Sequence, residues 1–309
     1  MRLLIVNYHY IRDDKPKAGI YPLSTAEFQA QVEVLGRFYR FTSQEELFGM
    51  VDSDSFPNDN LCLLTFDDSL AEQWTALDVL AGLSISALCF ATTDSIVNRR
   101  AHDVHKLHHV FSATPEDKLL EILNGEFGIG EEQVDQAILD KEYRYDSATM
   151  RRVKFILNYR LSDDARRIAV DRLFAEIEPD EKMFSDTLYM TAEQLATLGR
   201  RGMLGTHGRS HRPLAILPPA DMHDEIAGSK KVLESITGSA IRSISYPYGG
   251  PAAVSPQVAS VARDAGIRFG FTMFRGVNDE HDLRDGLMLK RVDTNDAPGG
   301  KLRSNQYVP

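Results

Sequence analysis

The sequence has few cysteines and no long apolar run. Its only two cysteines, Cys62 and Cys89, lie inside strand-like apolar runs, where a small buried thiol is the expected role. No apolar run approaches the length needed to cross a bilayer. The opening 1–9 carries one charge and four aliphatic residues before it turns polar, which is too short for a signal-peptide core and predicts a first strand. We therefore expect reduced thiols and a cytoplasmic protein.

Basic residues are also scarce relative to acidic ones. The chain has 35 Lys and Arg against 45 Asp and Glu, and its formal net charge is −10. This argues against a nucleic-acid binder, because no Lys/Arg-rich face is there to neutralise phosphates. A local basic groove for an anionic substrate stays open. With 309 residues, of which 43% are apolar, the chain can bury a large core, as one α/β domain with an insertion or as two domains.

Short β-rich runs alternate with helix-like spacing of apolar residues. Ser24-x-x-Glu27 and Ser43-x-x-Glu46 resemble capping boxes that open helices. The alternation predicts parallel strands with crossover helices, in a barrel or a doubly wound sheet. The further expected helices are 70–83, 191–201, 221–236 and 256–265. The expected strands are 3–8, 61–66, 85–91, 203–205, 242–246, 269–274 and 287–292.

The segment from about residue 98 to 188 breaks this rhythm, since it is rich in charge and helix formers and has no convincing strand. We predict a single domain over residues 1–309 with a helical insertion at about 98–188. The insertion could act as a lid or substrate platform, or equally as a structural buttress or dimer surface. The helices expected within it are 116–123, 131–142, 148–157 and 163–176.

Two motifs supply metal-ligand chemistry. Thr65-Phe66-Asp67-Asp68 places adjacent carboxylates at the end of an apolar strand, and on its own it would be interpreted as a helix N-cap. His207-x-x-x-His211 changes that interpretation, because two imidazoles at this spacing can reach one ion. One Asp and two His can hold a divalent metal with an open position for water, and the spare Asp can take a proton. The motifs together predict a metal-dependent hydrolase.

A third motif, Ser245-Tyr246-Pro247-Tyr248-Gly249-Gly250, follows another expected strand. Pro247 fixes the chain and the glycines permit a sharp turn, so the main chain at Tyr248 can face a cavity. A backbone N–H directed there could stabilise an oxyanion. An ordinary strand-ending turn with a packed tyrosine is the alternative.

The candidate residues share a position, because each follows the end of an expected strand. In a βα barrel all strand carboxyl ends lie on one face, where loops build active sites. A doubly wound sheet also gathers ligands at strand carboxyl ends, so the pattern favours α/β more firmly than it favours a barrel.

These three motifs, in this order, resemble the polysaccharide deacetylase family, the NodB-homology carbohydrate esterases. Pro213-Leu214 after the histidine pair and the opening Tyr8-His9-Tyr10-Ile11 add to the resemblance, which covers the strand-bearing parts and not the insertion. The resemblance implies a distorted (β/α)7 TIM-like barrel that binds zinc or another divalent ion.

The resemblance also implies roles for individual residues. Asp67 would be the general base, and Tyr248 would supply the N–H that stabilises the oxyanion. We expect the turn around Tyr248 to contact substrate. The implied metal ligands are Asp68, His207 and His211. The expected substrate-binding residues are Tyr246, Pro247 and Gly249.

One departure from the family pattern concerns the general acid. Many family members carry a late Leu-x-His motif, and no such motif follows Phe274. We predict that His9 protonates the departing amine instead, because the first strand approaches the last when the barrel closes. A role for His9 in packing or in supporting a neighbouring group is the alternative.

Another departure concerns the arginine that often precedes the Pro-Tyr motif, because Ser245 stands in that place. We predict that Arg291, near the end of the last strand, orients Asp67 through a charge-assisted hydrogen bond. A surface salt bridge is the competing interpretation. Ser69 also stands where the family usually has glycine.

The sequence therefore predicts a zinc-dependent N-deacetylase of an N-acetylated sugar in a glycan or glycan precursor, with an intracellular intermediate favoured over finished wall polymer. One alternative keeps the metal but acts on a small substrate, as an amidase, deformylase or O-acetyl esterase. Another is a catalytically silent carbohydrate-binding relative. We expect a carbohydrate partner, no nucleic acid and no transmembrane segment; a homo-oligomer is compatible with the sequence.

Overall fold

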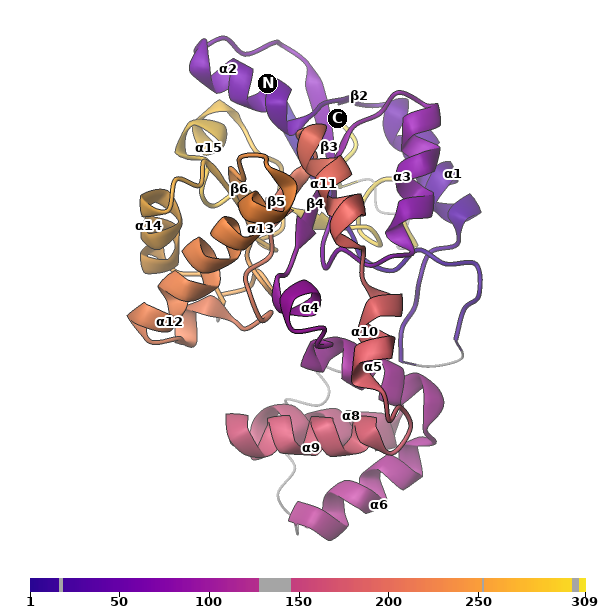
Figure 1. The fold of residues 1–309 in the computed structure, drawn as a ribbon. Coiled ribbons are helices and arrows are strands. Elements are labelled where there is room, and N and C mark those ends of the chain that lie inside the picture. The colour runs from indigo at the N-terminus through magenta and orange to yellow at the C-terminus, as the bar shows by residue number, and fades with distance from the viewer. Residues whose placement is uncertain (17–18, 128–145, 252, 302–305) are drawn as a thin grey trace. The chain divides into compact units, whose positions relative to one another are not determined.

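The computed structural model describes residues 1–16, 19–127, 146–251, 253–301 and 306–309 (Figure 1). The chain divides into two compact units. This division does not decide between one domain with an insertion and two domains, so the single-domain prediction stays a prediction. The first unit comprises Met1–Asp14, Pro22–Arg100 and Ser185–Pro309, and the second comprises Lys15–Tyr21 and Ala101–Phe184.

A curled sheet of parallel strands organises the first unit and confirms the predicted α/β barrel-like fold. The strand order is β7-β6-β5-β4-β3-β1-β8, and β2 pairs with β3 outside this path. The short strand β2 was not predicted. The strands are β1 (Arg2–Tyr8), β2 (Arg40–Phe41), β3 (Asn60–Phe66), β4 (Ala87–Ala91), β5 (Leu204–Thr206), β6 (Ser243–Ser245), β7 (Phe269–Phe271) and β8 (Val292–Asp293).

The segment around β8 contacts both β7 and β1. Leu289 forms a parallel bridge with Phe271 of β7, and Val292 pairs with Val6 of β1. The predicted strand 287–292 is therefore divided between two partners, because closing a curled sheet requires the last segment to pass from one edge to the other. Its regular part is only the two residues of β8.

Several helices of the first unit start at capping residues that the sequence shows. Ser24 and Glu27 form a complete capping box at the start of α1. Ser43 caps α2 by accepting from the Glu46 backbone N–H, but the Glu46 side chain accepts from Thr42. Helices α1 and α3 lie side by side (Figure 1). The helices are α1 (Thr25–Gly36), α2 (Gln44–Asp52), α3 (Gln73–Gly82), α4 (Asp94–Val97), α11 (Ala192–Arg200), α12 (Pro219–His223), α13 (Ser229–Thr237), α14 (Pro256–Asp264) and α15 (Glu280–Asp285), with the 3-10 turn η3 (Leu214–Ile216) and the π-helical η4 (Asp224–Gly228).

Side chains of β1 alternate between two apolar clusters. Leu3 and Ile5 pack with residues of β3, β4 and β7, whereas Leu4, Val6 and Tyr8 pack with helices α1 and α3. This period of two is the ordinary consequence of strand geometry. The set that contains Leu3 and Ile5 faces the inside of the curled sheet, and its continuation toward the strand carboxyl ends leads to the polar residues described below.

The second unit is helical and has its own apolar cluster, which includes Leu107, Val110, Leu123, Val153 and Leu173. The helix expected at 131–142 lies outside the described residues. No helix in the described ranges is both long enough and apolar enough to cross a bilayer. The helices are α5 (Asp103–Ala113), α6 (Glu116–Phe127), α8 (Ala148–Phe155), the π-helical η2 (Ile156–Arg160) and α9 (Asp163–Ala175); α10 (Glu181–Leu188) begins in this unit and ends in the first.

A fully buried lysine ties helices of the second unit together. The Lys106 ammonium lies 2.6 Å from an Asp171 carboxylate oxygen and 2.8 Å from a Glu181 oxygen. It also lies 5.5 Å from the centre of the Phe174 ring. Two carboxylates and an aromatic face compensate the loss of water around the charge.

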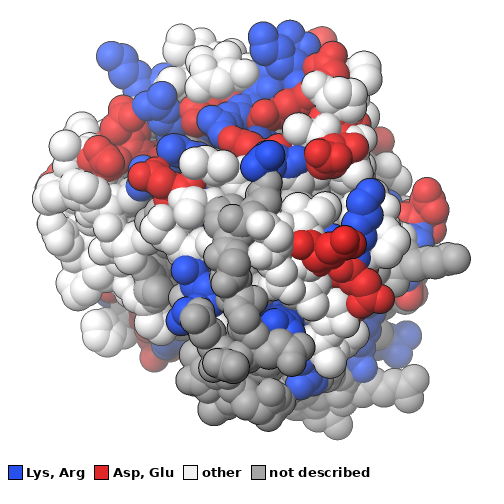
Figure 2. Space-filling model, turned by 90° about the horizontal axis from the view of Figure 1, so that it is seen from below, with Lys and Arg blue, Asp and Glu red and all other residues white. Residues whose placement is uncertain are grey.

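Acidic and basic side chains are interspersed on the face shown in Figure 2. Lys and Arg lie there among Asp, Glu and uncharged residues. The described side chains of this face therefore form no extended basic surface of the kind that follows a phosphate backbone.

Candidate functional site

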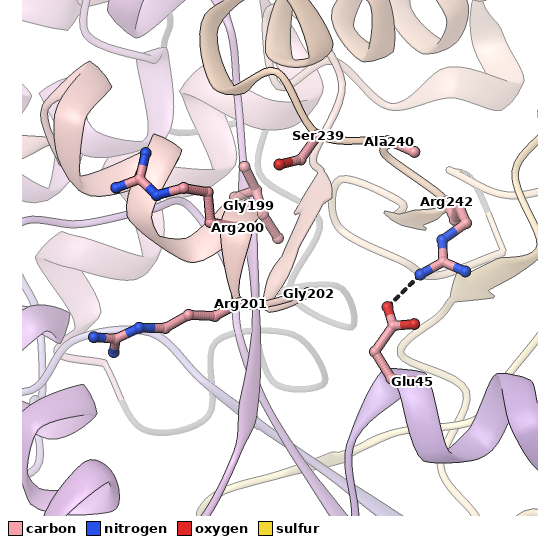
Figure 3. A pocket seen from close by; sticks show the side chains of 9 residues that line it. Glu45, Gly199, Arg200, Arg201, Gly202, Ser239, Ala240 and Arg242 are labelled. Atoms are coloured by element: carbon pink, nitrogen blue, oxygen red, sulfur yellow. Dashed lines mark hydrogen bonds and ion pairs between the residues drawn. The ribbon is translucent and has the colours of Figure 1, made fainter.

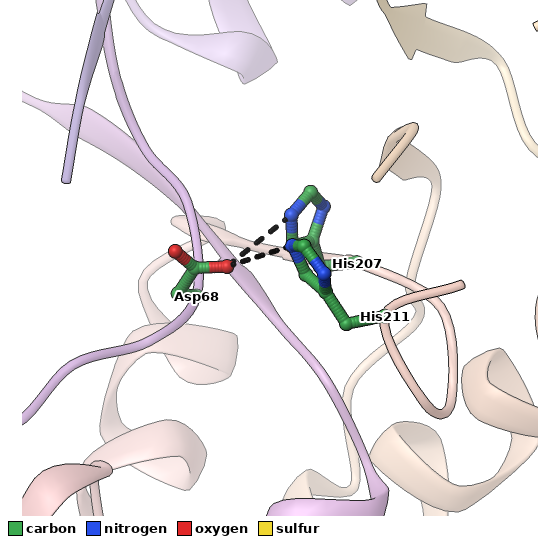
Figure 4. A group of neighbouring side chains, drawn as sticks. All are labelled: Asp68, His207 and His211. Atoms are coloured by element: carbon green, nitrogen blue, oxygen red, sulfur yellow. Dashed lines mark ion pairs between the residues drawn. The ribbon is translucent and has the colours of Figure 1, made fainter. Parts of the chain in front are cut away.

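Asp68, His207 and His211 form a buried cluster beyond the carboxyl ends of β3 and β5 (Figure 4). One Asp68 carboxylate oxygen lies 3.4 Å from Nε2 of His207 and 3.3 Å from Nε2 of His211. Ligand atoms held at about 2.0–2.1 Å from one tetrahedral ion lie about 3.3–3.4 Å from each other. The structure therefore brings the three predicted ligands together, at a spacing that fits a small divalent ion such as zinc.

The backbone at the end of β3 separates the two adjacent carboxylates. Asp68 and Ser69 both have positive φ, 75° and 50°, a left-handed conformation that costs free energy for residues other than glycine and often marks functional sites. This conformation breaks the strand alternation after Asp67. Asp67 therefore contacts Arg291 while Asp68 faces the histidines.

His207 is fixed in one orientation. Its Nδ1 lies 2.7 Å from the carbonyl oxygen of Ser245, so Nδ1 carries the proton that it donates, and Nε2 is left for a metal. Burial alone would lower the pKa of His207, but the charges of Asp67 and Asp68 outweigh it and the pKa is raised. The acidic residues thus make this imidazole a better base and a better ligand.

Asp67 forms a buried, bidentate ion pair with Arg291. The two guanidinium nitrogens lie 2.9 and 2.8 Å from the two carboxylate oxygens. The predicted contact is present, and it is not the surface salt bridge of the alternative, because Arg291 is 0% exposed. Burial alone would raise the pKa of Asp67, but Arg291, and to a lesser degree His207 and His9, hold it well below its usual range. Asp67 is therefore ionised near neutral pH.

A polar layer that the sequence did not reveal surrounds this ion pair. The Asn7 amide nitrogen donates to Asp67 at 3.0 Å, and its amide oxygen accepts from Arg291 at 2.8 Å. Arg291 also donates to the Ser245 hydroxyl at 2.8 Å and to the Thr272 carbonyl at 3.0 Å. Asn7 could have been recognised as the one polar residue at the inward positions of an otherwise apolar strand. Ser245 stands where the family pattern often has an arginine. Its hydroxyl accepts a hydrogen bond from the guanidinium of Arg291, which comes from a different segment.

His9 lies beside this ion pair. Its Nε2 is 4.0 Å from an Asp67 oxygen, and its side chain is 40% exposed. The first strand does bring His9 to the same face as the ligands. The distance exceeds that of a hydrogen bond, and its role as the acid stays a prediction.

Tyr248 lies in a left-handed turn next to the metal ligands. Its φ is 63°, and its ring centre is 4.9 Å from that of His211. The next residue, Gly249, has φ 59°, and a Cβ there would lie 2.5 Å from the backbone nitrogen of Met273. The sharp turn therefore requires glycine at position 249, and it presents Tyr248 at the site with 49% of its surface exposed.

Two residues expected to bind substrate are buried. Tyr246 is 0% exposed, packs in an apolar cluster and donates its hydroxyl to the Leu287 carbonyl at 3.0 Å. Its side chain therefore packs in the core, and a contact with substrate stays a prediction. Pro247 is also buried, which agrees with its role in fixing the turn.

A separate cavity of about 360 Å³ lies at the opposite ends of the strands. Arg201 precedes β5 and Arg242 precedes β6, whereas the metal ligands follow their strands. Figure 3 shows Arg200 and Arg201 directed away from the Arg242–Glu45 ion pair. Because its lining residues lie at the other ends of the strands from Asp68, His207 and His211, the cavity is not part of the candidate site.

The fold and the cluster define a class: an α/β protein with a curled parallel sheet that carries, at its carboxyl face, an Asp/His/His cluster able to hold a metal ion. A family model described as polysaccharide deacetylase matches residues 181–270, which include both histidines and the Tyr248 turn. This match confirms the resemblance deduced from the motifs. Among curated proteins, no sequence matches the chain significantly.

Solved structures share this fold. The Streptococcus pyogenes deacetylase PplD in complex with acetate is 17% identical, with a TM-score of 0.59 over 98% of this chain and 97% of PplD. IcaB from Ammonifex degensii is also 17% identical, with a TM-score of 0.59 over 98% and 95% of the two chains. A de-N-acetylase from Aggregatibacter actinomycetemcomitans is 13% identical, with a TM-score of 0.57 over 94% and 95%. At these identities the likeness shows the fold.

Proposed function

We propose that this chain is a metal-dependent hydrolase that removes N-acetyl groups from an amino-sugar-containing glycan or glycan precursor. The observation that carries the proposal is the different environment of two adjacent carboxylates. Asp68 lies within 3.4 Å of both histidines, whereas Asp67 is paired with Arg291. Three ligands beside an ionised carboxylate are what metal-assisted amide hydrolysis requires.

Each residue has a defined part in the proposed reaction. Asp68, His207 and His211 hold the ion, which when bound polarises the amide carbonyl and lowers the pKa of water. Asp67, kept ionised by Arg291, accepts a proton from the attacking water. The backbone N–H of Tyr248 donates to the developing oxyanion.

The departing amine needs a proton, and His9 is the proposed donor. It lies on the Asp67 side of the site, and its 40% exposed side chain is accessible to a substrate. Zinc is the proposed ion because two imidazoles and a carboxylate at this spacing suit its tetrahedral preference.

The comparisons support an N-acetylated sugar as the substrate class. The family match is to polysaccharide deacetylases, and PplD was solved with acetate, the product that deacetylation releases. The cytoplasmic location stays a prediction.

Acetate release tests the proposal. The purified protein, stripped with a chelator and reloaded with Zn²⁺, is expected to release acetate from N-acetylglucosamine oligomers. The variant Asp67→Asn should retain zinc and lose activity by at least about 100-fold, because the proton acceptor is gone. Asp221→Asn, at an exposed carboxylate, is the matched control and should leave activity unchanged.

Other outcomes would contradict this assignment. Hydrolysis of small formamides or of O-acetyl esters but not of N-acetyl sugars would replace the substrate class. Stoichiometric zinc binding without hydrolysis of any amide or ester would indicate a carbohydrate-binding relative instead of an enzyme.

A further inference from the structure

A buried carboxylate, Glu225, lies against the loop that joins the two metal-ligand histidines. Glu225 is 5% exposed, and it belongs to η4, the π-helical segment between α12 and α13. A π-helical turn accommodates an extra residue within a helix and often occurs at functional sites. A carboxylate in this position must be compensated by donors, because burial without them is costly.

The loop itself supplies those donors. The backbone N–H groups of Arg209 and Ser210 donate to the same Glu225 oxygen, at 2.8 and 2.9 Å. The Ser210 hydroxyl donates to the other oxygen. Hydrogen bonds to an ionised acceptor are stronger than those between neutral groups, so this carboxylate holds the loop more firmly than a neutral side chain could.

The same helical run also fixes the start of the loop. The Ser229 hydroxyl, four residues after Glu225, lies 2.7 Å from the Thr206 hydroxyl at the end of β5. Thr206 in turn accepts from the Gly208 backbone N–H at 3.2 Å. Three consecutive loop amides, at positions 208 to 210, are therefore bound by side chains rather than by water.

This support matters because the loop backbone is unusual. Gly208 has φ 76° and the ligand His211 has φ 58°, and a left-handed histidine is costly unless its surroundings impose it. A Cβ at position 208 would come 3.2 Å from the Glu225 carboxylate, so the carboxylate follows the loop surface closely. Without this acceptor the loop could relax and separate the two imidazoles.

We propose that Glu225 is a positioning residue that forms the His207–His211 loop for metal binding before the ion arrives. The inference rests on the proposed function, since it requires that the two histidines bind a metal. Because the loop is already ordered in the folded protein, metal binding does not have to include the entropic cost of ordering it. The affinity for the metal is therefore higher than it would be with a flexible loop.

Zinc affinity measured by competition with a chromophoric chelator tests the inference, with Zn²⁺ as the probe. Glu225→Ala is expected to weaken zinc binding by about 10–100-fold. Glu225→Gln keeps one acceptor oxygen and should recover part of this loss, and Ser210→Ala, which removes one of the three donors, should weaken binding by about threefold. Glu234→Ala is the matched control. Glu234 lies on α13, and its carboxylate also accepts a hydrogen bond from a backbone N–H, that of Ile241 at 3.0 Å.

Two further measurements separate positioning from a general structural effect. The kcat of Glu225→Ala should return toward the wild-type value when zinc is in excess, whereas a distorted site would stay slow. Urea unfolding of the metal-free variants should place Glu225→Ala and Glu234→Ala at similar stability while only the former loses affinity.

Each result leads to a distinct conclusion. A wild-type protein that binds no zinc would overturn the proposed function and this inference with it. Wild-type binding with Glu225→Ala within twofold would overturn the inference alone. If Glu225→Ala does not fold, Glu225→Gln and Ser210→Ala decide, and wild-type affinity in both would overturn it.

Discussion

Among the described residues, each unit of the protein buries one Lys or Arg side chain, and the two cations serve different purposes. In the first unit Arg291 is 0% exposed, and its partner Asp67 has a side chain that is 4% exposed. In the second unit the Lys106 side chain is 1% exposed, but its partners Asp171 and Glu181 are 43% and 34% exposed.

The difference lies in how much water the carboxylates keep. Asp171 and Glu181 remain partly hydrated, so they hold Lys106 without being confined to one geometry, and the contact ties helices together. Asp67 has lost its water, and the planar guanidinium fixes its orientation as well as its charge. A buried ion pair is weak evidence for stability, and this one is better understood as the device that orients the proposed base.

The largest expected effect comes from breaking the pair in the first unit. Arg291→Met should lower the free energy of unfolding by about 3–5 kcal/mol, because it leaves a carboxylate buried without its cation. Deacetylation should fall by about 100-fold or more, since the proposed base is no longer oriented. Arg291→Lys should not restore activity, because an ammonium cannot form two parallel hydrogen bonds.

Urea unfolding and acetate release measure the two losses separately. If Arg291→Met kept full activity at temperatures where it stays folded, the orienting role would be wrong.

A smaller effect is expected in the second unit. Lys106→Met should lower the free energy of unfolding by about 2 kcal/mol, less than Arg291→Met because its carboxylate partners can rehydrate. Urea unfolding followed by circular dichroism is the measurement. A loss equal to or larger than that of Arg291→Met would remove the distinction drawn between the two pairs.

The pH dependence of stability and of activity further separates the Asp67–Arg291 pair from the Lys106 pairs. The pKa of Asp67 is held below its usual range mainly by Arg291, against the opposing effect of burial. The pair therefore stabilises the fold above the unfolded-state pKa of about 4, and this contribution is lost as the pH falls through the lower folded-state value.

Removing the guanidinium should raise the pKa of Asp67. The acid limb of the kcat/KM profile of Arg291→Gln should therefore move to higher pH. Because the pKa of Asp67 lies below 3.8 in the wild type, its acid limb should enter profiles measured between pH 4 and 8 only in Arg291→Gln, and Lys106→Gln is the control that should match the wild type. An unchanged limb in Arg291→Gln would show that another group controls it.

The smallest expected effect concerns backbone strain beside Asp67. Ser69 has φ 50°, is 1% exposed, and its buried hydroxyl has no hydrogen-bond partner among the described residues. Ser69→Gly should stabilise the protein by about 1 kcal/mol, because glycine adopts this conformation without strain and removes the unsatisfied hydroxyl. Thermal unfolding measures the gain, and a loss of stability would show that the serine packs favourably.

Local sequence signals predicted the parts of the site that depend on strand ends. Asp67, Asp68 and the two histidines follow apolar strands, and parallel strands carry such residues to one face. The strands 3–8 and 61–66 were found almost to the residue, because each is a continuous apolar run of strand length that ends in polar residues.

The remaining features depend on contacts between distant segments. The role of Asn7 and Ser245 depends on Arg291, which donates hydrogen bonds to both side chains. No local sequence pattern shows in which direction a guanidinium group will extend. Tyr246 directly follows a strand of only three residues. That strand is too short to show an alternation of apolar and polar residues, so the sequence did not predict the burial of Tyr246. The π-helical segment that carries Glu225 has no sequence signature, since its spacing differs from an α-helix by one residue.

The position of Arg291, directly before β8 in the segment that contacts both β7 and β1, has a consequence for folding. A chain in which this segment has not docked lacks the guanidinium that holds the pKa of Asp67 below its usual range. Docking of this segment therefore both completes the sheet and forms the buried ion pair of the proposed base.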